Sequence, residues 1–237
     1  MSSANQFSAG PDYPYYLHWN YASYERGHRI NQRLAQMTRV TPDSLRLLQN
    51  DNLNLNAQLM LPRLLSLVQA AQLPAAQRQA YDELSRWNYF YEAGAIGPSI
   101  FELWYGNLVK RLWDDDFGLK ATGLEMRRPD RDRTNTLLLQ EPNSRWIDDK
   151  RTPAKETLET LARQSLQFAT DSLTRKFGPL GPEWRWANQK STDILHLAQL
   201  AGFGRMDLNV GGGAGIVNAT SINGNYLRLF AWICDSK

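Results

Sequence analysis

Apolar side chains recur at helical spacing over most of this chain. Between residues 21 and 37, for example, the helical period places Tyr24, Ile30 and Leu34 on one side. The same criterion predicts further helices, and the last of them has the most regular pattern. The expected helices cover residues 21–37, 42–61, 64–71, 74–87, 98–113 and 153–177. Residues 119–140 show no clear period, so no regular element is predicted there.

The second expected helix has the strongest start signal. Thr41-Pro42-Asp43-Ser44 combines a capping hydroxyl, a proline suited to the first turn and a carboxylate favoured at the positive end of a helix. The leucines that follow lie on one stripe and predict a single continuous helix; they are Leu45, Leu48, Leu55 and Leu59. Pro62 is expected to end or kink this helix, because proline removes a backbone donor.

The two ends of the chain differ from this helical middle. Residues 2–8 are small and polar and are interpreted as the end of a strand. Near the other end, an Asn223-Gly224 turn precedes the apolar run 226–233, which predicts a buried or half-buried strand. We therefore expect an α+β fold in one partial domain, residues 1–237. Its two ends, residues 1–20 and 205–237, would contribute strands to one sheet, and the region between them, residues 21–204, would be mainly helical. Neither end has enough strands to form a sheet by itself.

Composition and charge exclude several classes of protein. Hydrophobic residues make up 42% of the chain and charged residues 22%, which is typical of a globular domain. The net charge of +3 results from 27 basic and 24 acidic residues that are interspersed, so no nucleic-acid partner is expected. No apolar run is long enough to span a membrane, and residues 1–10 lack the features of a signal peptide.

Two clusters suggest ligand binding, but the residues around them favour structural roles. The glycines at 211–215 precede a predicted strand and no Gly-Lys-Ser or Gly-Lys-Thr follows, so we expect a turn or close backbone packing there and no phosphate loop. Asp114-Asp115-Asp116 ends a helix, where anions are disfavoured; a solvated turn with some counter-charge is preferred over a cation site. Three scattered histidines and the single Cys234 make no zinc site, so no metal or cofactor is predicted.

An aromatic run near the start of the chain is a candidate binding surface. Six of the twelve residues from 13 to 24 are aromatic, against 11% in the whole chain. Core packing and a ligand-facing edge account for the run equally well, because Tyr and Trp combine an apolar ring with a polar group. The candidate contact residues are Tyr15, Tyr16 and Trp19. Ser2 is a separate candidate, since removal of Met1 would place its hydroxyl beside an amine of pKa roughly 7.7–8.0, but an ordinary small residue is the preferred interpretation.

A series of short motifs occurs in an order that is characteristic of one enzyme family. It begins with Ala4-Asn5-Gln6, Tyr13-Pro14 and residues 26–30, and continues with the Leu-Gln-x-Asp-Asn pattern at 48–52. The other matching segments are 59–65, 84–88, 100–104, 146–149, 156–158, 212–213, 217–219 and 226–228. In this order the chain resembles the penicillin acylase (penicillin amidase) family of N-terminal nucleophile hydrolases. The resemblance spans nearly the whole sequence and depends on the shared order of the motifs.

The resemblance implies a fold, a reaction and two site residues. The fold would be a portion of the αββα N-terminal nucleophile sandwich, dominated by a long helical insertion between terminal strands. Family precursors cut themselves into two chains, and the N-terminal serine of the second chain attacks an amide with its own α-amino group as base. Asn5 would contribute to the oxyanion hole, and Arg26 would support the active site, with Arg29 as the alternative. Calcium is possible in the full-length family protein, and a periplasmic location is implied.

Departures from the family pattern lead to two hypotheses. In the family, the nucleophile precedes the asparagine motif, and Ser2 lacks the signature of that nucleophile. The family also often has a histidine after a Trp-x-Trp-Gly motif. Here the corresponding segment is Trp184-Arg185-Trp186-Ala187, and it leads to Lys190. The first hypothesis is a fragment of the second chain of an amide hydrolase, inactive alone, whose partners are a small-molecule amide and the rest of the precursor: the first chain and the start of the second. The alternative is a non-catalytic helical binding module that uses the Tyr/Trp run. The preferred acyl group stays open.

Overall fold

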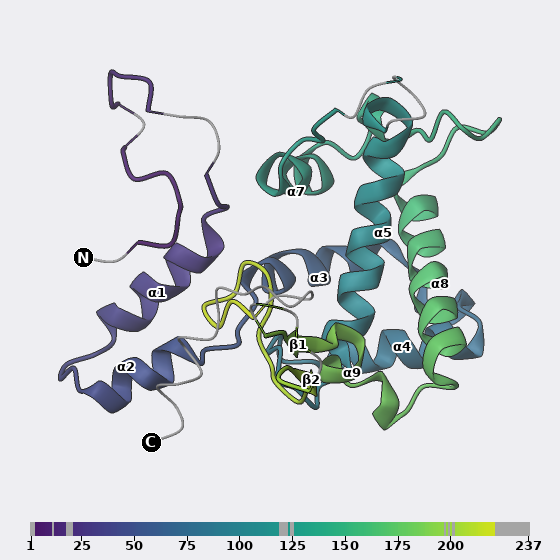
Figure 1. Ribbon diagram of the computed structural model, residues 1–237. Coiled ribbons are helices and arrows are strands. Elements are labelled where there is room, and N and C mark those ends of the chain that lie inside the picture. Colours follow the sequence, from purple (N-terminus) through teal and green to yellow (C-terminus); the bar gives the residue numbers. More distant parts are fainter. Residues whose placement is uncertain are drawn as a thin grey trace. The chain divides into compact units, whose positions relative to one another are not determined.

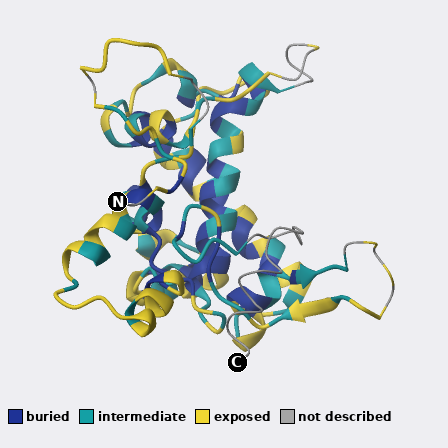
Figure 2. Cartoon of the chain, turned by 60° about the vertical axis from the view of Figure 1, so that its left-hand side comes forward, coloured by how far each residue is buried: buried dark blue, intermediate teal, exposed yellow. Residues whose placement is uncertain are grey.

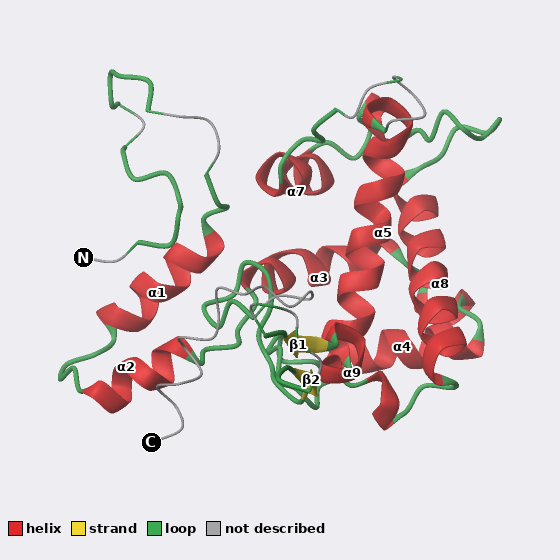
Figure 3. Cartoon of the chain, viewed as in Figure 1, coloured by secondary structure: helices red, strands yellow, loops and turns green. Residues whose placement is uncertain are grey.

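The computed structural model describes residues 3–10, 12–17, 21–118, 123, 126–196, 198, 200 and 202–220. Helices dominate this part of the chain, and two short strands pair in a small sheet (Figure 1; Figure 3). The α-helices are α1 (Glu25–Ala35), α2 (Pro42–Gln49), α3 (Leu55–Leu67), α4 (Ala75–Arg86), α5 (Gly97–Phe117), α7 (Arg131–Gln140), α8 (Leu158–Phe177) and α9 (Trp186–Lys190). The 3₁₀ helices and strands are η1 (Ala70–Gln72), η2 (Arg145–Ile147), η3 (Pro182–Trp184), β1 (Thr192–Ile194) and β2 (Arg205–Leu208). The described residues thus have the expected mixed α+β character.

The chain divides into two compact units. We call them the junction unit, residues 1–56, 89–95 and 185–237, and the helical unit, residues 57–88 and 96–184. Along the sequence, the helical unit is inserted in two pieces between the segments of the junction unit. Each unit is therefore assembled from segments that are distant in the sequence.

The helical unit is built around α5. Eleven of its residues are buried, and α4 and α8 both pack against it (Figure 1; dark blue in Figure 2). Leu108 and Leu112 of α5 and Leu166 of α8 are completely buried. The Trp104 indole N–H donates to the carbonyl of Ala162, 2.8 Å away, so this large buried side chain also has its polar atom satisfied.

Helix α7 forms where the sequence predicted no element. Asp130 caps it, its carboxylate accepting from the Arg133 N–H at 2.8 Å. Its buried face is half polar: the Tyr105 hydroxyl donates to Asn135 at 2.7 Å, and the Trp113 indole N–H donates to Thr134 at 3.1 Å. A search for apolar periodicity misses such a helix, because tertiary hydrogen bonds make its polar residues part of the core.

The single helix predicted across the leucine stripe at 45–59 is wrong. The chain instead forms α2, with the predicted Thr41 cap, and α3, separated by residues 50–54. In that interval the Asn54 N–H donates to the Tyr89 carbonyl at 3.1 Å, and Leu53 bridges Phe90 in antiparallel fashion. Pairing with a distant segment thus replaces the helical bonds that the stripe predicted. Pro62 lies inside α3, which continues to Leu67.

The start of the long helix near residue 153 was also predicted too early. Helix α8 begins at Leu158, where the Thr157 hydroxyl accepts from the Thr160 N–H at 3.3 Å. It ends as predicted at Gly178, whose φ of 83° is accessible to glycine. The threonine cap determines the boundary more strongly than Pro153 does.

The junction unit is centred on a hydrogen-bonded meeting of three short segments. The Tyr91 N–H donates to the Asn52 carbonyl at 2.9 Å, and the Gly212 N–H donates to the Tyr91 carbonyl at 2.8 Å. Tyr91 is completely buried and packs edge-to-face against Trp186, with ring centroids 5.2 Å apart. Residues near 50, 90 and 212 therefore form one structure, although they are far apart in the sequence.

The predicted sheet-forming ends are only partly realised in the described residues. Residues 3–10 and 12–17 contain no strand; the left-handed backbone of Asn5 (φ 63°) turns the chain and prevents an extended run. Strand β2 lies within the predicted end 205–237, but its antiparallel partner β1 lies in the region expected to be helical. Their register pairs Thr192 with Leu208. The strand predicted at 226–233 lies outside the described residues.

Candidate functional site

Asn5 is held in an unusual backbone conformation beside the start of α1. Its φ is 63°, and its side chain is exposed. The Asn5 carbonyl accepts a hydrogen bond from the Ala22 N–H at 2.8 Å, and the neighbouring Ala4 is buried. A left-handed conformation is costly for most residues, although asparagine tolerates it better than others. The backbone is thus anchored while the amide side chain stays available.

Gln6 and Gly27 fix this segment against α1. The Gln6 side-chain carbonyl accepts from the Ala4 N–H at 2.7 Å. A Cβ at Gly27 would lie 2.9 Å from Cδ of Gln6, so the absence of a side chain at Gly27 lets Gln6 approach the helix. The close approach brings the Asn5 segment to the first turns of α1, which also carry Arg26.

The arginines of α1 differ in their partners. Arg26 is half-buried. Arg29, the alternative from the sequence, makes a bidentate ion pair with Asp51: its Nη2 lies 2.7 Å from Oδ2, and its Nε donates at 3.1 Å. Arg33 adds a second contact, with Nε 3.3 Å from the same carboxylate. Arg29 therefore has a structural partner in Asp51.

Asp51 belongs to a polar network that sequence reasoning did not assign a role. Its carbonyl accepts from the Asn218 N–H at 3.1 Å. The Asn218 amide donates to Asn52 at 2.9 Å, and Asn52 in turn donates to Glu92 at 3.1 Å. The signal in the sequence was the Asn50-Asp51-Asn52 run between two leucine-rich segments, since buried polar residues need partners.

The glycine cluster at 211–215 is a site of close backbone packing, as predicted. A Cβ at Gly211 would lie 2.5 Å from the Tyr91 carbonyl oxygen, and one at Gly212 would overlap the Asn218 carbonyl. The Trp186 indole N–H donates to the Gly212 carbonyl at 2.8 Å. The cluster is therefore a close-packed part of the junction unit.

Lys190 is buried next to this cluster. Only 1% of its surface is exposed. Its ammonium donates to the Gly211 carbonyl at 2.5 Å and to the Thr220 hydroxyl at 2.8 Å. Lysine supplies three donors on a long stem, so Lys190 can link the first residue of the glycine cluster to Thr220, five residues beyond its end.

The aromatic run does not form a core where it is described. Tyr15 and Tyr16 are 74% and 78% exposed, and Tyr13 packs edge-to-face on Tyr15 with centroids 5.9 Å apart. Trp19 lies outside the described residues, as does Ser2. This exposure is not compatible with core packing of the two tyrosines within the described residues.

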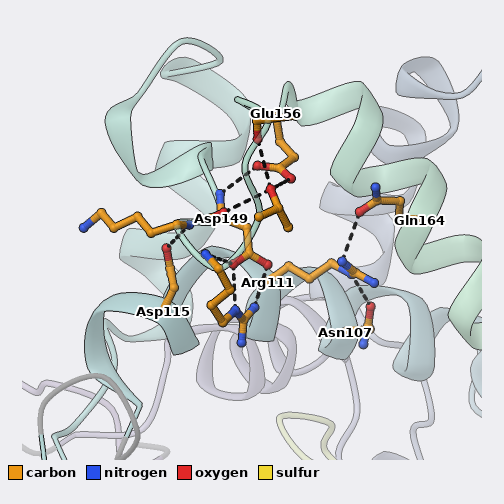
Figure 4. Close-up of polar contacts among 10 residues, drawn as sticks. Asn107, Arg111, Asp115, Asp149, Glu156 and Gln164 are labelled. Atoms are coloured by element: carbon orange, nitrogen blue, oxygen red, sulfur yellow. Dashed lines mark hydrogen bonds and ion pairs between the residues drawn. The ribbon is translucent and has the colours of Figure 1, made fainter.

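A separate polar cluster lies in the helical unit, around Asp149 (Figure 4). Two Arg151 hydrogen bonds, of which the closer is 2.6 Å, lower the pKa of the Asp149 carboxyl, and the charge of Arg111 adds to the effect. Arg111 itself donates to Asn107 at 2.9 Å and to Gln164 at 3.0 Å. The Glu156 carboxylate accepts from the Asp149 N–H at 3.0 Å. Because these groups satisfy one another, we interpret the cluster as a support for the loop 148–156.

Two of the three aspartates near the end of α5 have the counter-charges that the sequence suggested. Arg128 forms an ion pair with Asp114, and Lys150 with Asp116. Asp115 is buried and accepts from the Lys150 N–H at 3.0 Å. The expectation of a solvated turn is therefore wrong for Asp115, because the loop after η2 covers it.

No group of three or more His, Cys, Asp and Glu side chains in the described residues is arranged to hold a metal ion. Within the same residues, no helix combines the length and the apolar character that crossing a bilayer requires.

A comparison with protein families identifies the class to which the molecule belongs. The model of the penicillin amidase family matches residues 1–234, nearly the whole chain. The chain therefore belongs to the penicillin amidase family, as its motifs suggested, and family membership indicates an amide hydrolase. No curated protein sequence matches it.

Proposed function

We propose that this chain contributes Asn5 and Arg26 to the active site of a penicillin-amidase-like hydrolase of amide bonds. The observation that carries the proposal is the geometry at the start of α1: Asn5 has an anchored backbone and an exposed amide, and Gln6 packs against Gly27, next to Arg26. An oxyanion hole needs a donor that is fixed before the reaction begins. The locked segment Ala4–Gln6 suits that role.

The reaction would proceed through an acyl-enzyme. A serine hydroxyl attacks the amide carbonyl carbon, its proton passes to the α-amino group of the same serine, and the carbonyl oxygen becomes an oxyanion. The Asn5 side-chain N–H would donate to this oxygen. The tetrahedral intermediate then breaks its C–N bond, the amine leaves with the proton, and water hydrolyses the resulting ester. Arg26 would order the groups around the serine and the substrate.

We place the nucleophilic serine outside these 237 residues, and this chain in the αββα sandwich of the family. Family resemblance supports both statements, since the nucleophile motif of the family precedes the asparagine motif. The substrate would be a small amide, and Tyr15 and Tyr16 are the described residues proposed to contact its acyl group. Their exposure supports this assignment.

The test uses the full-length gene product that contains this chain, assayed with chromogenic anilides of different acyl groups. Asn5→Gly removes the amide donor yet suits the left-handed backbone, so the fold should be retained. We expect kcat to fall by about 10²–10³. Asn143→Gly, in an exposed turn of the helical unit, is the matched control and should keep the parental kcat.

Two results would contradict the proposal. One is an Asn5→Gly enzyme with the parental kcat. The other is saturable amidase activity of the purified 237-residue chain that Ser2→Ala abolishes, because the nucleophile would then lie within the chain.

A non-catalytic binding module is the second candidate, favoured by the exposure of Tyr15 and Tyr16. It predicts that the full-length gene product has no amidase activity with any acyl group. It also predicts that Tyr16→Ala weakens ligand binding, measured by calorimetry, without changing the stability of the chain. Amide hydrolysis that depends on Asn5 excludes this candidate.

A further inference from the structure

Helix α1 carries three arginines on one face. Arg26, Arg29 and Arg33 are separated by three and four positions, so they are neighbours along the helix. Like charges at this spacing repel one another and destabilise an isolated helix. An anion beside this face would offset that repulsion and could also orient the helix.

Asp51 provides that anion. Its side chain is 6% exposed, whereas those of Arg29 and Arg33 are 15% and 36% exposed. The bidentate contact with Arg29 is directional, since a planar guanidinium matches a carboxylate in only a few orientations. The Arg33 contact, one turn further along, adds a second point. Two points on one helix fix its rotation as well as its position.

Asp51 is itself immobilised. Its Oδ1 accepts from the Leu53 N–H at 3.1 Å, and its carbonyl accepts from the Asn218 N–H at 3.1 Å. Asn52, the next residue, accepts two hydrogen bonds: its side-chain oxygen accepts from the Asn218 amide, and its backbone carbonyl accepts from the Tyr91 N–H. The backbone that carries the carboxylate is therefore held by hydrogen bonds to the segments around Tyr91 and Asn218.

We propose that Asp51 is a positioning residue for Arg26. By binding Arg29 and Arg33, it orients α1 and neutralises part of its basic face, which leaves Arg26 as the cation presented to the reaction. The inference rests on the proposed function, because it takes Arg26 as part of the active site. Asp51 touches neither the substrate nor the nucleophile in this scheme.

The decisive experiment compares Asp51→Asn in two backgrounds of the full-length gene product, the parental sequence and Arg26→Met. Asparagine keeps the shape of the side chain and removes the charge. In the parental background we expect kcat to fall on the order of 10²-fold with little change in KM, as for a misplaced active-site group. In the Arg26→Met background we expect no further loss, because residues that act as one unit are not additive. Equal losses in the two backgrounds would show a merely structural role and overturn the inference.

Two further variants control for folding and for the chemical change. Arg29→Lys keeps the charge and loses the bidentate geometry, so kcat should fall about tenfold in a protein that remains folded. Asp82→Asn breaks an exposed ion pair with Arg78 on α4 and should leave kcat unchanged. Parental kcat in Arg29→Lys would contradict the inference even if Asp51→Asn cannot be purified.

Hydrogen exchange on the 237-residue chain gives a readout that does not need activity. Asp51→Asn should speed the exchange of the α1 amides and leave that of the α8 amides unchanged. Unchanged exchange in α1 would refute the positioning role. If Arg26→Met itself retains the parental kcat, the proposed role of Arg26 is at fault; if only the Asp51 effects are missing, the inference alone fails.

Discussion

Different interactions stabilise the interior of each of the two units. In the helical unit, large apolar side chains pack around α5. Truncating one of them would therefore lose buried apolar surface and leave a cavity. In the junction unit, short segments meet through backbone hydrogen bonds, buried polar side chains and glycines with no room for a Cβ. The site that we propose for catalysis lies in the junction unit. Directional polar contacts position groups more narrowly than apolar packing does, which suits a catalytic centre.

The largest effect that tests this contrast is expected in the helical unit. Leu108→Ala removes a completely buried side chain from the centre of α5. We expect the free energy of unfolding to fall by about 2–5 kcal/mol, through lost burial and the cavity that remains. Urea unfolding followed by circular dichroism measures this change. Leu47→Ala, at a position that is 59% exposed, should change it by less than about 0.5 kcal/mol.

An intermediate effect is expected at Lys190 in the junction unit. Lys190→Met keeps the length of the stem and removes the donors to Gly211 and Thr220. We expect a loss of about 1–3 kcal/mol, because the carbonyl of Gly211 would lose a charged partner in a buried place. Lys155→Met, at an exposed position, is the matched control. If Lys190→Met changed the free energy of unfolding no more than this control does, buried polar contacts would not stabilise the junction unit in the way that we describe.

The smallest effect is a dependence on pH at Asp149 in the helical unit. Arg151 lowers the pKa of the Asp149 carboxyl in the folded state. A lowered folded pKa means that the ion pair contributes fully above the unfolded value, about 3.9, and is lost as the pH falls through the folded value. We expect Asp149→Asn to cost about 1 kcal/mol or less at pH 7, since Arg151 is half exposed. Urea midpoints of the parent and the variant should converge below about pH 4, the unfolded value; a constant difference throughout the acid range would exclude this mechanism.

Much of the helical unit was predictable from the sequence. Helix α4, most of α5 and the end of α8 at Gly178 follow from apolar spacing and termination signals. Helix α7 was not predictable in this way, because Thr134 and Asn135 are core residues only when Trp113 and Tyr105 are there to bond them. Local patterns reveal burial of apolar groups and do not reveal which polar groups will find partners.

The candidate site was predictable only in part. Its residue types and their order indicated the family, and the family match over residues 1–234 confirms it. The roles of Asn5 and Arg26 stay predictions. The ion pair between Arg29 and Asp51 was not predictable from the sequence, because residues 22 positions apart are brought together only by the fold.

The sequence by itself determined the family, most of the helices and the close packing at the glycine cluster, since these depend on local spacing, termination signals and motif order. Tertiary structure decided the break between α2 and α3, the left-handed turn at Asn5 and the polar network around Asp51. The physical reason is the same in each case. A backbone donor or a charge takes the partner that folding brings to it, and that partner can lie anywhere along the chain.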